Sequence, residues 1–108
     1  MTELKEIFGA LQQKLDENPG KVEGINATYF FNLSDNGVPH QYHIAVADGV
    51  AKVNEGGVDN PSITIFMDAN DFLAVASGQL NPMTAFMGGK LKLQGDMMLA
   101  MKLQSMLG

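Results

Sequence analysis

The sequence predicts an α+β domain in which a five-stranded, mainly antiparallel sheet carries its helices on one face. Apolar residues recur at helical spacing near the start of the chain and again after residue 68, whereas the segments between them alternate with a period of two. Glycine, asparagine and proline separate these segments, as is typical of turns. With 108 residues, 45% of them hydrophobic, the chain can bury one core, and we expect a single domain over residues 1–108.

The first half of the chain predicts one helix followed by four strands. Residues 4–15 form an amphipathic helix that ends at Asn18-Pro-Gly20. The period of two begins at Ile25 and predicts strands near residues 25–34, 42–46, 50–53 and 63–67. Tight turns at Asp35-Asn-Gly37 and Asp48-Gly49 join the first three strands as hairpins, and residues 54–61 form a longer loop.

The second half predicts three helices and a fifth strand. Asp68 is a suitable N-cap for a helix over residues 69–77, and Asn81-Pro82 begins a short helix that Gly88-Gly89 ends. Residues 90–94 alternate as a strand, with lysines outward and leucines inward. Asp96 caps the last helix, over residues 97–107.

This last helix is apolar on two faces. One stripe, suited to packing on a core, comprises Leu99, Ala100, Leu103, Met106 and Leu107. Met97, Met98 and Met101 fall on a second face, which one sheet would not cover. Seven of the eight methionines lie at residue 67 or beyond, and methionine suits surfaces that accommodate several apolar shapes. Two interpretations stay open: the methionines fill an irregular core, or they line a surface that meets a ligand or a partner.

Charge argues against one class of partner and leaves another open. The net charge is −5 and every cation is a lysine, so we expect no nucleic-acid binding. Residues 1–78 hold four lysines and eleven carboxylates, whereas residues 79–108 hold three lysines and Asp96 alone. The mildly basic segment is therefore also the one with surplus apolar surface. It suits an anionic amphiphile or transient contact with an anionic membrane, or else its lysines are simply solvated on an edge strand.

No grouping of residues predicts catalysis. His40 and His43 are three apart on a strand and point to opposite faces, and helix capping accounts for Asp68, Asp71 and Asp96. Gly88-Gly-Lys90 lacks the first glycine of a phosphate loop and precedes a strand. The chain has no cysteine. We therefore expect a protein that is not an enzyme and uses neither metal nor cofactor.

The ordered set of motifs resembles the sterol carrier protein 2 family of non-specific lipid-transfer domains. The matching segments, spread over essentially the whole chain, are residues 48–53, 60–65, 71–73, 77–78, 81–83, 85–87 and 89–103. Asn81-Pro-Met83 and Gly89-Lys-Leu-Lys-Leu-Gln-Gly-Asp96 carry the most weight. The resemblance implies a five-stranded sheet with helices over one face and a hydrophobic tunnel between them. It also implies non-covalent binding of fatty acids, fatty acyl-CoA, phospholipids or sterols.

Lining residues follow from this resemblance. The C-terminal helix of such proteins borders the tunnel, which makes Met97, Met98 and Met101 the leading candidates. The two preceding helices would supply a second wall, and inward sheet residues would form the floor or belong to the plain core. These further candidates are Phe31, Ile44, Phe72, Val75, Met83, Phe86 and Met87.

Localisation, ligand and partner complete the expectations. The N-terminus lacks the pattern of a signal peptide, no apolar run approaches the roughly 20 residues of a membrane span, and the chain ends Ser105-Met-Leu-Gly108 rather than in a Ser-Lys-Leu signal. We expect a free-standing cytoplasmic carrier for which a fatty acyl chain is a better ligand than a sterol. The alternative is a module that uses the same methionine-rich face to form a homodimer or to join a lipid-metabolising enzyme.

Overall fold

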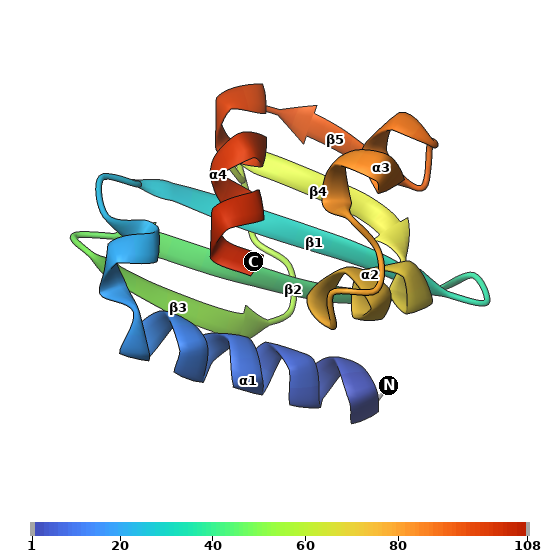
Figure 1. The fold of residues 1–108 in the computed structure, drawn as a ribbon, viewed down its shortest axis with the longest axis horizontal. Coiled ribbons are helices and arrows are strands. Elements are labelled where there is room, and N and C mark those ends of the chain that lie inside the picture. The colour runs from blue at the N-terminus through green and yellow to red at the C-terminus, as the bar shows by residue number, and fades with distance from the viewer. Residues whose placement is uncertain (1, 108) are drawn as a thin grey trace.

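The sheet has five strands in the order β3-β2-β1-β4-β5 (Figure 1). The computed structural model describes residues 2–107. Its strands are β1 (Ala27–Asp35), β2 (Val38–Ala47), β3 (Val50–Glu55), β4 (Ile63–Asp68) and β5 (Leu91–Gly95). Its helices are α1 (Thr2–Glu17), the 3₁₀ turn η1 (Pro19–Val22), α2 (Ala69–Ala76), α3 (Pro82–Met87) and α4 (Met97–Leu107). The predicted α+β class and the predicted order of elements are confirmed, and η1 is the one addition.

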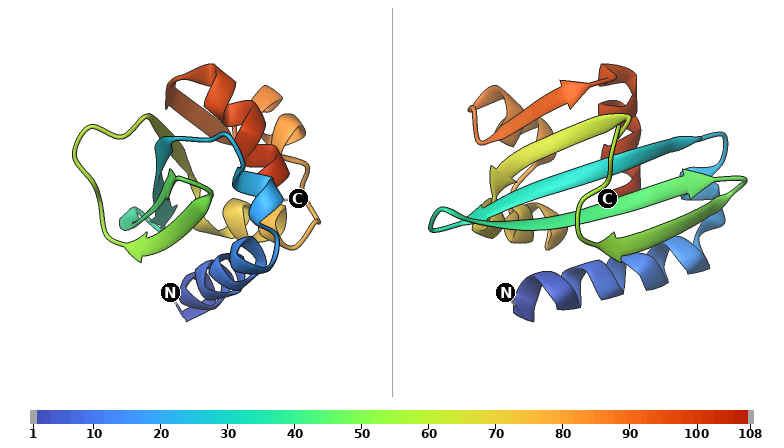
Figure 2. Two further views of the ribbon diagram at one scale, coloured as in Figure 1. Left: turned by 90° about the vertical axis from the view of Figure 1, so that its left-hand side faces the viewer. Right: turned by 180° about the vertical axis from the view of Figure 1, so that it is seen from behind.

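The sheet is mixed because β4 joins β1 in parallel. The pairs β1–β2, β2–β3 and β4–β5 are antiparallel, as predicted for most of the sheet. The chain reaches β4 by a loop that leaves β3 and crosses the face without helices, which Figure 2 shows from behind. Two hydrogen bonds hold the loop to β2: Gly56 N–H donates to the Gln41 carbonyl at 2.7 Å, and His43 Nδ1 lies 2.9 Å from the Gly56 carbonyl.

All helices lie over the other face of the sheet (Figure 1). The alternation in the strands explains this, because every second side chain is buried and the others face solvent or the crossing loop. Helix α1 packs along β3, and its Gln12 side chain forms two hydrogen bonds with the backbone of that edge strand. The Gln12 amide donates to the Ala51 carbonyl at 2.8 Å and accepts from Val53 N–H at 2.6 Å. Helix α4 packs on β4, β5 and η1 instead.

Three N-caps begin the later helices as the sequence predicts. Asp68 accepts from Asn70 N–H at 2.8 Å, Asn81 from Met83 N–H at 2.8 Å, and Asp96 from Met98 N–H at 2.9 Å. Gly95, just before α4, has φ of +126°. A side chain there would place its Cβ 2.5 Å from the Ser62 carbonyl oxygen, so only glycine allows β5 to approach β4 so closely.

Helix α4 is attached to the rest of the molecule by hydrogen bonds at both ends. Tyr29 Oη donates to the Leu99 carbonyl at 3.1 Å, near the start of the helix. At the other end, Lys14 Nζ donates to the Leu107 carbonyl at 3.2 Å and Lys21 Nζ to the Ser105 carbonyl at 3.1 Å. Two cations beside the negative pole of the helix stabilise it.

Candidate functional site

Four aromatic rings form a wall near the middle of the helix-covered face. Phe8 of α1 stacks on Tyr42, with ring centroids 4.1 Å apart, and on Phe72, at 5.1 Å. Phe31 of β1 meets Phe8 and Phe72 edge to face, each at 5.5 Å. These arrangements are favourable for aromatic pairs, and all four rings are buried. On the α1 side of this wall, the rings and the aliphatic side chains around them form a closed core.

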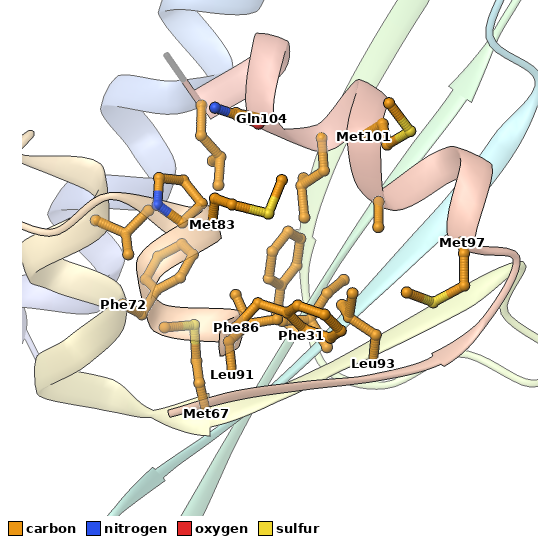
Figure 3. A pocket seen from close by; sticks show the side chains of 16 residues that line it. Phe31, Met67, Phe72, Met83, Phe86, Leu91, Leu93, Met97, Met101 and Gln104 are labelled. Carbon is orange, nitrogen blue, oxygen red and sulfur yellow. The ribbon is translucent and has the colours of Figure 1, made fainter. Parts of the chain in front are cut away.

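A cavity of about 120 Å³ lies on the other side of the wall, between the sheet and helices α2, α3 and α4. Figure 3 shows the sixteen side chains that line it, and all of them except Gln104 are apolar. The sheet contributes Phe31, Ile65, Met67, Leu91 and Leu93. The helices contribute Phe72, Val75, Pro82, Met83, Phe86, Met97, Ala100, Met101, Leu103, Gln104 and Leu107.

The exposed lining residues mark the mouth of the cavity. Phe31, Ile65 and Phe72 are almost completely buried and form the interior. Met83 and Phe86 on α3, and Met97 and Met101 on α4, are 40–68% exposed. In Figure 3, Met83 and Met97 extend toward the same space from opposite helices. The cavity therefore opens to solvent between α3 and α4, and flexible side chains flank its mouth.

Seven of the ten lining residues proposed from the sequence contact the cavity. They are Phe31, Phe72, Val75, Met83, Phe86, Met97 and Met101. Ile44, Met87 and Met98 do not line it.

Each exception has a geometric reason. Ile44 is fully buried between Tyr29 and Val53 of the neighbouring strands, in the half of the sheet that α1 covers. Met87 is the last residue of α3 and is 80% exposed. Met98 lies off the lining face of α4, because one residue along a helix turns the side chain by about 100° from Met97, whereas Met101 returns to the face of Met97.

The sequence analysis also missed part of the lining. Ile65, Leu91 and Leu93 are inward residues of β4 and β5, and their alternation was a usable signal. Ala100, Leu103 and Leu107 belong to the stripe assigned to core packing, and that stripe borders the cavity as well. Nothing in the sequence singled out Gln104 as a lining residue, because a lone polar residue on a helix is usually solvated.

Gln104 and Tyr29 are the polar groups that matter most near the site. The Gln104 amide offers two donors and one acceptor at the cavity surface. Tyr29 of β1 holds α4 in place through its hydrogen bond to the Leu99 carbonyl. Burial, with a smaller contribution from the Asp96 carboxylate, raises the pKa of Tyr29 to about 12. The phenol therefore remains a neutral donor to the Leu99 carbonyl over the whole ordinary pH range.

Two further findings concern metal binding and membrane spanning within residues 2–107. Within that range, no group of three or more His, Cys, Asp or Glu side chains is placed to hold a metal ion. None of the helices in the same range combines the length and the apolar composition that crossing a bilayer requires.

Fold and cavity together define a small α+β domain with an apolar chamber under its helices. Residues 8–108 match the sequence model of the SCP-2 sterol transfer family. This chain therefore belongs to that family. Sterol carrier protein 2 of Bos taurus is 36% identical over 103 residues, which cover 93% of this chain and 19% of the bovine protein. The chain thus spans about a fifth of the length of this relative.

Solved structures show the same fold. The solution structure of the sterol carrier protein domain 2 of Helicoverpa armigera superposes with a TM-score of 0.83 at 30% identity, covering 97% of this chain and 85% of that one. The solution structure of palmitated SCP2L2 from Aedes aegypti gives a TM-score of 0.80 at 22% identity, covering 94% and 90%.

Proposed function

We propose that this protein binds and carries lipids that bear an acyl chain, fatty acids or fatty acyl-CoA, without changing them chemically. The observation that carries the proposal is the cavity itself. Fifteen of its sixteen lining side chains are apolar, and exposed side chains of α3 and α4 flank its mouth. Burial of each methylene group contributes about 0.8 kcal/mol, so an acyl chain gains affinity with each carbon that enters.

The size of the cavity implies that α3 and α4 separate when ligand enters. A cavity of about 150 Å³ admits a molecule the size of benzene, and drug-sized ligands occupy pockets of roughly 300–1,000 Å³. The chamber of about 120 Å³ therefore accommodates only a few methylene groups as it stands. Met83, Met97 and Met101 at the mouth rotate at low cost, which allows the chamber to lengthen between the two helices.

The head group would remain at the surface of the chamber. Gln104 is the one polar lining residue, and its amide donates to a carboxylate or an ester carbonyl. A coenzyme A moiety is too large and polar for the chamber and would lie in solvent, where Lys102 follows the mouth residue Met101. Low selectivity for chain shape follows from a lining rich in methionine.

The test is the displacement of a fluorescent fatty acid by fatty acids of increasing length, palmitate among them. We expect affinity to rise by up to about fourfold per methylene and then to level off when the chamber is full. Ala100→Phe should fill the chamber and weaken binding at least tenfold, an effect on the scale of burying one large apolar side chain. Met98→Gln is the matched control on the same helix and should leave binding unchanged. Equal binding by wild type and Ala100→Phe would refute the proposal.

A further inference from the structure

The two edges of the sheet are protected to different degrees. At the β3 edge, α1 packs along the strand, and the Gln12 side chain is hydrogen-bonded to the Ala51 carbonyl and to Val53 N–H. At the other edge, β5 runs along the upper border of the sheet in the view from behind in Figure 2. The unpaired backbone groups of an edge strand can pair with another strand, so the state of these groups on β5 matters.

The register of the sheet determines which backbone groups of β5 point away from β4. Asp96 N–H donates to the Ser62 carbonyl at 3.2 Å, and these two residues lie opposite each other in the ladder. Bonded and non-bonded pairs alternate along an antiparallel ladder, so Lys92 and Gln94 also bond to β4. The N–H and C=O groups of the alternate residues therefore point outward: Leu91, Leu93 and Gly95. Within residues 2–107, no hydrogen bond from outside the ladder engages these groups.

The sequence of this edge is complementary to itself. When two copies of β5 are placed antiparallel with Leu93 opposite Leu93, the outward residues of one copy meet those of the other. On the helix-free face, this register places Lys92 opposite Gln94 of the second copy. At the ends of the strands it places Lys90 opposite Asp96 of the second copy. Each of these pairs occurs twice by symmetry, and none opposes two like charges.

We propose that two copies of this chain pair through β5, antiparallel and centred on Leu93, so that their sheets become one continuous sheet. Three opposed pairs of outward residues provide about six backbone hydrogen bonds. The two-fold axis is perpendicular to the sheet, so the helices of both copies lie on the same face. Because Gln12 already bonds the outward groups of β3, that edge cannot accept β5 of a further copy, and the assembly closes as a dimer.

The same pairing covers two exposed apolar side chains that the chamber leaves unexplained. Helix α3 ends at Met87, shortly before β5, and α4 begins directly after Asp96. Both helices contact β5, so antiparallel pairing brings the end of α3 in one copy beside the start of α4 in the other. Met87 and Met98 are 80% and 67% exposed and do not line the chamber, and they can be buried across this seam. Stable homodimers bury such apolar surface in addition to their polar contacts.

The second copy also adds to the wall of the binding chamber. Leu93 lines the chamber from β5. In the proposed register, Leu93 of the second copy lies directly opposite it on the same face of the sheet, with the two Cβ atoms about 5 Å apart. The apolar wall therefore continues past the edge of a single sheet.

A second copy fits this edge better than a peptide from another protein. Any extended peptide could bond to the outward backbone groups of β5. Only a strand that presents a carboxylate opposite Lys90 and an uncharged or acidic residue opposite Lys92 also matches the side chains. The β5 strand itself, read in the opposite direction, supplies both residues at the required spacing.

The experiment measures the dimer dissociation constant of the full chain by sedimentation equilibrium, with substitutions at the exposed Gln94. Gln94→Lys opposes two lysines at two symmetric positions and should weaken the dimer about fivefold. Gln94→Glu places a carboxylate opposite Lys92 and should strengthen the dimer by a similar factor. Adding Lys92→Glu to Gln94→Lys restores opposite charges in reversed order and should restore wild-type affinity.

Gln79 provides the matched control. It is an exposed glutamine that follows α2 and lies outside β5. Gln79→Lys and Gln79→Glu make the same changes in net charge as the substitutions at Gln94. Both variants should dimerise like wild type.

Amide hydrogen exchange of wild type tests the register directly. Exchange should slow with rising protein concentration at the residues whose N–H groups point outward: Leu91, Leu93 and Gly95. Exchange at Lys92 and Gln94 should change little, because their N–H groups already bond to β4 in a single copy. Slowing at Lys92 and Gln94 alone would contradict the register.

The outcomes decide the inference without reference to the proposed function. A dimer whose affinity follows the charge at residue 94 supports the pairing of β5 with β5. A monomer at millimolar concentration overturns it, as does an assembly that grows beyond two copies. A dimer insensitive to the charge at residue 94 also overturns it, and loss of that dimer in Met87→Ser/Met98→Ser would assign the interface to the helices alone. Gln94 does not line the chamber, so fatty-acid displacement by the same variants tests the carrier function separately.

Discussion

The two halves of the helix-covered face are built from the same sheet but filled differently. Under α1, Phe8 contacts three other rings, and the Gln12 amide is hydrogen-bonded to the edge strand β3. Under α2, α3 and α4, half of the sixteen lining side chains are methionine or leucine, and the lining encloses a chamber of about 120 Å³. Rigid rings with fixed contacts close one half, whereas flexible thioethers keep the other half adaptable.

Phe31 and Phe72 belong to both halves. Each packs on Phe8 on one side and lines the chamber on the other. The closed half therefore supplies the rigid wall against which ligand would be held. A binding domain of this size can tolerate an unfilled chamber because the stability needed to maintain it comes from the other half.

The largest expected loss of stability is that of Phe8→Ala, in the closed half. This change removes the ring that three others contact and should lower the free energy of unfolding by about 3–5 kcal/mol. Met101→Ala, in the adaptable half, should cost no more than about 1 kcal/mol because the side chain is 68% exposed. Urea denaturation of both variants measures the two losses of unfolding free energy. Equal losses would mean that the two halves do not differ in rigidity.

Tyr29→Phe should have an intermediate effect. It removes the hydrogen bond to the Leu99 carbonyl and should cost about 1 kcal/mol. Amide hydrogen exchange should accelerate in the first turns of α4 and remain unchanged in α1. Acceleration throughout the chain would show that α4 is not a separate unit.

The same tyrosine predicts a dependence on pH. Burial and the Asp96 charge raise the pKa of Tyr29 from 10.0 to about 12, so the folded state holds this proton more tightly than the unfolded state. The resulting stability is complete below pH 10 and is lost as the pH rises toward 12. Denaturation midpoints measured below and above pH 10 should fall less in Tyr29→Phe than in wild type. Some decline should remain, because burial and Glu55 also raise the pKa of Tyr42.

The smallest expected effect concerns selectivity. Met83→Ile/Met101→Ile keeps the mouth apolar but makes both side chains stiff at their first torsion. Stability should stay within about 0.5 kcal/mol, as is usual for exposed positions. The ratio of affinities for straight and branched acyl chains should change by roughly two- to threefold, because the mouth adapts less readily. An unchanged ratio would mean that methionine flexibility does not set the breadth of binding.

Local chemistry made most of the fold predictable. Asp68, Asn81 and Asp96 cap their helices as expected, because capping depends on neighbouring residues alone. The parallel pairing of β1 with β4 was not predicted. Alternation determines which face of a strand is buried but not which strand lies beside it, and here a long loop brings distant segments together.

The site was predictable to the extent that a helical wheel allows. The wheel placed Met97, Met98 and Met101 on one extra face, but the line along which α4 crosses the sheet decides which of them reaches the chamber. Ile44 shows the same limit in a strand. Its inward direction was predictable, yet its place under α1 depends on the strand order.

The attachments of α4 have a consequence for how the molecule assembles. Its hydrogen bonds reach back over 70 residues to Tyr29, 84 residues to Lys21 and 93 residues to Lys14. Contacts of such long range form late, because the entropy of closing the intervening chain must be overcome first. On the ribosome these partners are made before α4, so the sheet and the aromatic half can fold before α4 covers the chamber. Newly made protein would then expose the inner wall of the chamber until α4 docks.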